Sequence, residues 1–145
     1  MSGATPARLY CLLAGTVLVF LGIAGFFVNA EFPGRDAAAD PENQGELLGL
    51  FAVNGWHNVA GLAGGLTGLA AAGSAARAYA LVFGGFLTAL GIFGIVAGET
   101  EGAIAWLSIN TADNILHTAI GVPGVLAGIA TPSGRQRARP RAAAT

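Results

Sequence analysis

Four long apolar segments that hold almost no charged residue constrain this fold more than any other feature. The first runs from Leu9 to Val28, about 20 residues, and at roughly 1.5 Å per residue a helix of that length crosses a bilayer core of about 30 Å. The others run from Leu47 to about Ala72, from Ala78 to Ala97, and from about Ala103 to Ala130. The sequence therefore predicts an all-α integral membrane protein, folded as a four-transmembrane-helix bundle.

The composition favours a membrane protein over a soluble domain. Only 10% of the residues are charged and 54% are hydrophobic, whereas a soluble domain carries roughly 25% charged residues. The chain also has 23 glycines, and small residues let membrane helices approach closely. The single cysteine, Cys11, excludes an intramolecular disulfide and is expected to pack as a small residue in the first helix. Glycines at small-xxx-small spacing are Gly61, Gly64, Gly65, Gly68, Gly124 and Gly128.

The first apolar segment has a second interpretation as a secretory signal. Arg8 would be its basic start, and Val28-Asn29-Ala30 would be its cleavage site. The segment is longer than the usual apolar region of roughly 7–15 residues. A similar pattern also returns later in the chain, from Ala76. We therefore favour a transmembrane helix.

The second and fourth apolar segments are longer than one span requires. The second is either one tilted helix, or Leu47 to Val53 lies at the outer interface and the helix begins near Trp56. We favour the break, because Asn54-Gly55 is a natural helix stop and tryptophan is enriched at membrane interfaces. The fourth segment has the same overlong form, with Trp106 in its first part.

Charge segregation predicts the orientation in the membrane. The basic residues Arg8, Arg77 and those of the C-terminal tail fall on one side of a four-span chain, whereas the acidic connections, with Arg35 alone, fall on the other. Positive charge near helix ends marks the cytoplasmic face. We expect a multi-pass protein of the bacterial inner membrane with both termini cytoplasmic.

The tail, residues 131–145, is predicted to be basic and disordered, outside a single membrane domain of residues 1–130. Its charges are expected to enforce topology, with binding of anionic lipid head groups as a second role. No aromatic residues alternate with these charges, so no nucleic-acid partner is expected. The four residues concerned are Arg135, Arg137, Arg139 and Arg141.

An internal repeat divides the membrane domain into two units. The stretch Ala-Arg-Leu-Tyr-Cys-Leu-Leu-Ala-Gly from Ala7 aligns with Ala-Arg-Ala-Tyr-Ala-Leu-Val-Phe-Gly from Ala76, and Asn-Gly-Trp-His-Asn from Asn54 aligns with Asn-Thr-Ala-Asp-Asn from Asn110. This predicts two tandem two-helix repeats, about residues 7–73 and about residues 76–130, related by an axis along the membrane normal. The glycine faces are used within one chain or shared with a second copy or another membrane protein.

Two polar faces interrupt the apolar segments. Asp113 is the only acidic residue among them, and burying an aspartate at mid-helix costs about 2.5–3.5 kcal/mol. Two or three hydrogen bonds of roughly 0.6 kcal/mol each barely offset that. Asp113 is therefore expected near the wet interface, paired with a histidine, or retained for function. The first face holds Asn54, His57 and Asn58, and the second holds Asn110, Asp113, Asn114 and His117 at helical spacing.

Three interpretations of this cluster stay open. In the structural one, which we favour, the side chains hydrogen-bond between the repeats and Asp113 pairs with His57 or His117. In the second, a pocket open to the outside binds a small ligand, or carries protons or a small solute past Asp113 and His117. In the third, His57 and His117 bind haem or a transition metal, but two histidines are too few for a zinc site. No nucleophile motif is visible, so an enzyme is not expected.

The polar motifs also carry a family resemblance. The pattern Leu-Leu-Gly-Leu-Phe-Ala-Val-Asn-Gly-Trp-His-Asn from Leu47, followed by Ala-Arg-Ala-Tyr and by Asn-Thr-Ala-Asp-Asn-Ile-Leu-His, resembles domain-of-unknown-function family 4383. The resemblance covers about Ala7 to Ala130. It implies an uncharacterised bacterial membrane protein with four helices and brings no activity with it. Members often carry a further histidine where this chain has Gly61.

Overall fold

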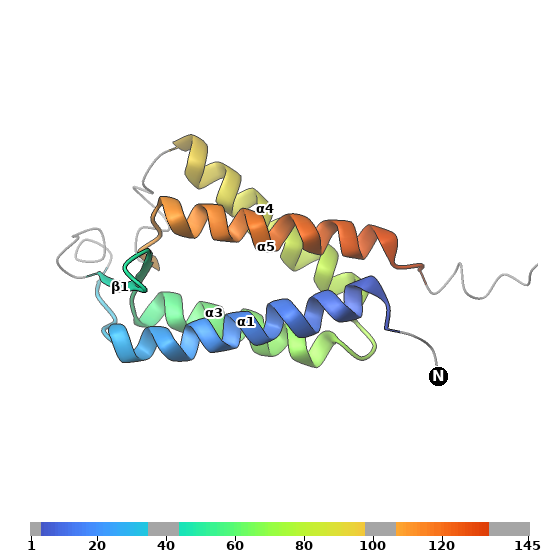
Figure 1. Cartoon of the computed structure of the whole chain (residues 1–145), viewed down its shortest axis with the longest axis horizontal. Coiled ribbons are helices and arrows are strands. Elements are labelled where there is room, and N and C mark those ends of the chain that lie inside the picture. Colours follow the sequence, from blue (N-terminus) through green and yellow to red (C-terminus); the bar gives the residue numbers. More distant parts are fainter. Residues whose placement is uncertain (1–3, 35–43, 98–106, 134–145) are drawn as a thin grey trace, which may run out of the picture.

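The computed structural model describes residues 4–34, 44–97 and 107–133 (Figure 1). These residues are mostly helical, as predicted, but a short antiparallel hairpin follows the first helix and was not predicted. The helices are α1 (Pro6–Val28), α3 (Gly55–Ala71), α4 (Ala76–Ala97) and α5 (Thr111–Ala130). The hairpin consists of β1 (Gly45–Leu47) and β2 (Phe51–Val53), with Glu46 opposite Ala52.

Side-chain caps decide where three of these helices begin. The Thr5 hydroxyl accepts from the Arg8 backbone N–H, with Pro6 in the first turn of α1. Asn54 and Asn110 cap α3 and α5 in the same way. The break predicted at Asn54 is therefore confirmed. The fourth apolar segment, expected from about Ala103 in the same overlong form, is divided in the same way, because Asn110 caps α5 and the helix begins at Thr111.

Glycines pack α1 along α3 and α4 along α5. A Cβ added to Gly15 would lie 2.9 Å from the Gly65 carbonyl oxygen, and one added to Gly84 would lie 2.9 Å from the Gly121 carbonyl oxygen. Both distances are too short for a real Cβ, so only glycine permits these backbone contacts. The two contacts occur at equivalent positions of the sequence repeat, since Gly15 aligns with Gly84 and Gly65 aligns with Gly121.

The two helix pairs meet through two aligned tyrosines. The Tyr10 ring of α1 lies against Gly124 of α5, and the Tyr79 ring of α4 lies against Gly68 of α3. The two rings are 6.4 Å apart. The Tyr79 hydroxyl donates to the Gly64 carbonyl (2.7 Å). Small side chains complete this core: Ala7, Cys11, Ala14, Ala72, Ala76 and Ala80.

Many large apolar side chains point outward, whereas the core around the two tyrosines is built mostly from small ones. Phe20 is 68% exposed in the middle of α1, and Phe27 is 88% exposed in its last turn. Val82 and Val96 are exposed in the same manner on α4. By length and composition, α1 and α4 are long and apolar enough to cross a membrane.

The start of α1 and the end of α5 lie at the same end of the bundle (Figure 1). Thr131 holds them together, because its hydroxyl accepts from the Ala7 N–H (2.9 Å) and its carbonyl accepts from Arg77 Nε (3.0 Å). The hairpin and the starts of α3 and α5 lie at the opposite end, which we call the hairpin end. The predicted tail arginines, Arg135, Arg137, Arg139 and Arg141, and Trp106 lie outside the described residues.

Candidate functional site

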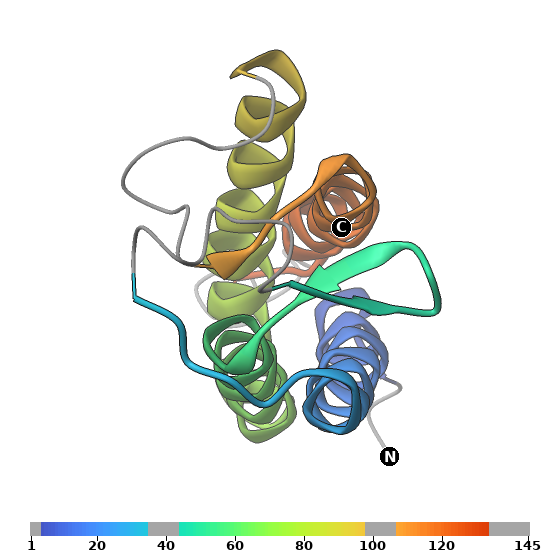
Figure 2. The ribbon, with the colours of Figure 1, turned by 90° about the vertical axis from the view of Figure 1, so that its left-hand side faces the viewer.

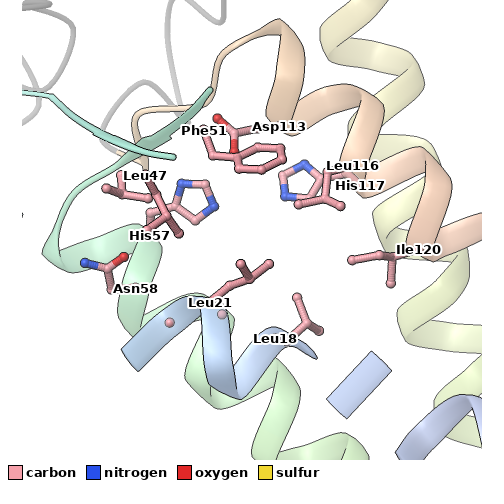
Figure 3. Close-up of a pocket in the computed structure, with 13 residues that line it drawn as sticks. Leu18, Leu21, Leu47, Phe51, His57, Asn58, Asp113, Leu116, His117 and Ile120 are labelled. Atoms are coloured by element: carbon pink, nitrogen blue, oxygen red, sulfur yellow. The ribbon is translucent and has the colours of Figure 1, made fainter. Parts of the chain in front are cut away.

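A small cavity lies at the hairpin end, between α1, α3, α5 and the hairpin. Its volume is about 50 Å³. A buried water needs at least roughly 10–15 Å³ of such space, so the cavity has room for a few waters. Its polar lining comes from His57, Asn58, Asp113 and His117 (Figure 3). Its apolar lining comes from Leu18, Leu21, Leu47, Phe51, Val53, Leu116 and Ile120, with Gly22 and Gly61.

The two histidines face each other across this cavity (Figure 3). Their ring centroids are 6.1 Å apart and their planes are tilted by 44°. His57 Nδ1 lies 3.3 Å from the Ser108 carbonyl oxygen. A carbonyl only accepts hydrogen bonds, so in this contact Nδ1 carries a hydrogen and donates it. His117 Nδ1 is buried and has no hydrogen-bond partner in the part of the chain that the structure describes.

Asp113 is held by backbone amides. It is only 2% exposed, and its Oδ2 accepts from the Ala52 N–H (3.1 Å) and from the Asn110 N–H (3.0 Å). The Asn110 side chain in turn accepts from the Asp113 N–H (3.0 Å), which completes a capping box. Asp113 lies near enough to His57 for their charges to interact. The Ala52 N–H of β2 and the Asn110 N–H of the helix cap both donate to Oδ2, and the pairing of Asp113 with His57 or His117 stays a prediction.

The two cap asparagines join the halves of the molecule. Asn54 Nδ2 donates to the Ser108 hydroxyl (2.7 Å), and Asn110 Nδ2 donates to the Leu50 carbonyl (2.8 Å). Hydrogen bonds between the two halves were predicted, and they occur, but their acceptors are Ser108 and the hairpin backbone. Asn54 and Asn110 were expected on helix faces. They precede the helices instead, because their side-chain oxygens cap the first turn.

Asn58 and Asn114 serve helix packing within each pair. Asn58 Nδ2 donates to the Asn29 carbonyl (2.8 Å), and its side chain covers Gly25 of α1. Asn114 covers Gly94 of α4 at the aligned position. Asn58 borders the cavity, whereas Asn114 does not line it. Of the seven predicted polar residues, three therefore face the cavity with titratable groups: His57, Asp113 and His117.

Sequence reasoning missed Ser108. It is buried and lies directly between the two halves, where its hydroxyl accepts from Asn54 and its carbonyl contacts His57. Its backbone is left-handed, with φ of 50°. Serine rarely adopts this conformation, so no sequence signal marks it.

The donor set and the cavity size do not fit the predicted haem or metal. Among the described residues, no group of three or more His, Cys, Asp or Glu side chains is placed to hold a metal ion. Pockets for drug-sized ligands measure roughly 300–1,000 Å³. A cavity of about 50 Å³ has no room for a haem between His57 and His117.

Comparison with known proteins gives a family and no further relative. No curated protein and no solved structure matches the chain. The family model described as "Domain of unknown function (DUF4383)" matches residues 8–130. That range includes the hairpin, every lining residue of the cavity, and both helix pairs apart from the first two residues of α1. The chain belongs to the DUF4383 family.

Proposed function

We propose that this protein is an integral membrane protein with four spans, in which His57, Asp113 and His117 form a hydrated proton-binding site. The observation that carries the proposal is the meeting of two histidines and a buried carboxylate around one cavity of about 50 Å³. A space of that size suits a few waters and protons. The proposal names the proton as the ligand of the small-ligand-binding module expected from the sequence. A site connected to both faces of the membrane would transport protons.

The distribution of side-chain sizes supports four spans. In water, exposed phenylalanines around an alanine- and glycine-rich core would be unfavourable, whereas in lipid they meet acyl chains. The α3 helix has 17 residues and is about 25 Å long, so it reaches across most of a bilayer core. The 20 residues of α5 reach slightly further.

Aligned contacts support two repeats, about residues 7–73 and about residues 76–130. The glycine contacts of Gly15 and Gly84, and the crossed packing of Tyr10 and Tyr79, occur at matching positions in the two pairs. His57 and Asp113 are themselves aligned, each three residues after a cap asparagine. One ancestral position thus supplies a base in one half of the site and an acid in the other.

The charge pattern supports an outer-side location for the cavity. The first turns of α1 and α4, which hold Arg8 and Arg77, lie at the end opposite the hairpin, and positive charge marks the cytoplasmic side. Both termini would then be cytoplasmic in the bacterial inner membrane. Protons would enter the cavity from the extracytoplasmic side.

A buried ring nitrogen without a hydrogen-bond partner supports the presence of water in the cavity. Buried nitrogen atoms nearly always have a hydrogen-bond partner, and His117 Nδ1 has none in the described protein. A water in the adjoining cavity would supply one. Water between the rings would also connect His57 and His117 for proton exchange, because their centroids are too far apart for a direct hydrogen bond.

An infrared pH titration of the protein in liposomes tests the proton site. The carboxyl band that disappears in Asp113→Asn reports the protonation of Asp113. Since coupled groups titrate together, we expect His57→Gln to move the midpoint of that band by at least about 0.5 pH unit. The exposed Glu46 of β1 provides the control, and Glu46→Gln should leave the midpoint in place.

Two results would refute the proton site. One is a midpoint that is the same in the wild type, His57→Gln and His117→Gln, since Asp113 would then titrate alone. The other is the absence of any pH-dependent band assignable to Asp113. No other titratable side chain lines the cavity from α1 or from the hairpin, so these three residues are sufficient for the test.

A further inference from the structure

The turn of the hairpin places a leucine where the backbone disfavours one. The Leu50 N–H donates to the Leu47 carbonyl (3.2 Å), which closes a β-turn with Leu48 and Gly49 at its centre. Leu48 and Gly49 both have left-handed backbones, with φ of 59° and 66°. Turns of this kind favour Asn, Asp or Gly at the first central position, and a leucine there is strained.

The same leucine is also poorly placed for water. Leu48 is 76% exposed and Leu50, on the other side of Gly49, is 57% exposed. Asparagine would suit both the left-handed backbone and an aqueous surface, whereas leucine suits neither. A strained and exposed apolar turn is consistent with an apolar partner that contacts the turn.

The position of the hairpin identifies that partner as lipid. The hairpin crosses the end of the bundle between α1 and α5, and its turn extends sideways past them (Figure 2). Its base packs on the end of α1, where a Cβ added to Gly45 would lie 2.9 Å from Val28 Cγ1. The exposed apolar surface of α1 also ends there, at Phe27 and Val28. The turn therefore lies at the level where the apolar band meets the polar connections.

We propose that residues 48–50 insert into the boundary between head groups and acyl chains of the outer leaflet. This inference rests on the four membrane spans proposed above and is independent of the proton site. Leu47 and Phe51, which flank the turn, line the cavity. Lipid contact at the turn would thus hold the hairpin over His57 and Asp113.

Fluorophore labelling in liposomes tests the insertion. The full chain would carry Cys11→Ala and one new cysteine, Leu48→Cys, labelled with an environment-sensitive dye. Cys11→Ala is expected to fold, because Ala80 aligns with Cys11 and is equally buried. Phe20→Cys is the control for the bilayer interior, since Phe20 is exposed at mid-helix. Gly34→Cys is the control for water, since a side chain there would meet nothing within 4 Å.

The insertion predicts a distinct quenching pattern for position 48. Nitroxides near the lipid head groups should quench the dye at least about twofold more strongly than nitroxides deep in the acyl chain, and aqueous iodide should quench it weakly. Position 20 should show the reverse depth preference, and position 34 should respond to iodide alone. A dye on Leu50→Cys should repeat the result of position 48 if the first variant folds poorly.

The outcomes separate this inference from the proposal on which it rests. If position 20 is quenched by deep nitroxides while positions 48 and 50 respond only to iodide, the spans stand and the lipid contact is refuted. A turn that binds a partner protein would give that same result, since no partner is present. If position 20 is not quenched by any lipid nitroxide, the spans are wrong and the inference is overturned with them.

Discussion

Replacing Gly84 with alanine is expected to destabilise the protein by about 1–3 kcal/mol, whereas the same change at Gly85 should leave the stability unchanged or raise it by up to about 1 kcal/mol. A Cβ on Gly84 would lie 2.9 Å from the Gly121 carbonyl oxygen and 2.9 Å from the Val125 nitrogen. These are backbone atoms, so α4 and α5 must move apart to admit the methyl group. A Cβ on Gly85 would meet nothing within 4 Å.

Reversible unfolding in mixed micelles measures the free energy of unfolding of both variants, whose substitutions are at adjacent residues of the same helix. The helix propensity gained by a glycine-to-alanine change is similar at both positions, so their difference isolates the helix contact. Gly15→Ala should resemble Gly84→Ala, because it meets the Gly65 carbonyl at the aligned position. Equal effects at Gly84 and Gly85 would show that α4 does not pack on α5 through this face.

Asp113→Ala is expected to cost about 2–4 kcal/mol, and Asp113→Asn less than about 1 kcal/mol. The alanine leaves the Ala52 and Asn110 N–H groups without their acceptor, and unsatisfied buried donors cost about 1–3 kcal/mol each. Both N–H groups donate to one carboxylate oxygen, so the amide oxygen of asparagine can accept both. Asparagine at this position therefore keeps both hydrogen bonds and removes only the carboxyl group that can bind a proton.

Unfolding measurements on these two variants separate structure from proton binding at Asp113. The account expects Asp113→Asn to fold with nearly wild-type stability while it loses the pH-dependent carboxyl band. Similar large losses in both variants would mean that the negative charge itself holds the hairpin end together. Similar small losses would mean that the hydrogen bonds from β2 and the cap are absent in the membrane.

The helices were predictable because their signals are local. Apolar runs predicted all four helices, and Asn54-Gly55 predicted the correct start for α3. The hairpin was not predicted, because Leu47 to Val53 has the composition of a membrane segment and its turn contains an unfavourable left-handed leucine. The start of α5 was left open within the fourth apolar segment, although Asn110 and Asp113 have the spacing of a capping box.

The sequence predicted which titratable residues line the candidate site better than it predicted what each side chain contacts. Helical spacing grouped Asp113 with His117, the internal repeat linked His57 to them, and these three residues line the cavity. The same spacing grouped Asn114 with them, although it turns toward Gly94 of its own helix pair. One hydrogen-bond partner of Asp113 is the backbone N–H of Ala52, 61 residues earlier in the sequence. Side-chain patterns carry no information about such groups.

The central claim is that both histidines share one hydrated cavity within two membrane-embedded helix pairs. The chain contains only two histidines, so histidine-labelled protein in lipid bilayers gives an unambiguous solid-state NMR experiment. The account predicts a carbon–carbon cross peak between the His57 and His117 rings, whose centroids lie 6.1 Å apart, and magnetisation transfer from water to both. Two rings without a mutual cross peak, or with transfer from acyl chains and none from water, would contradict it.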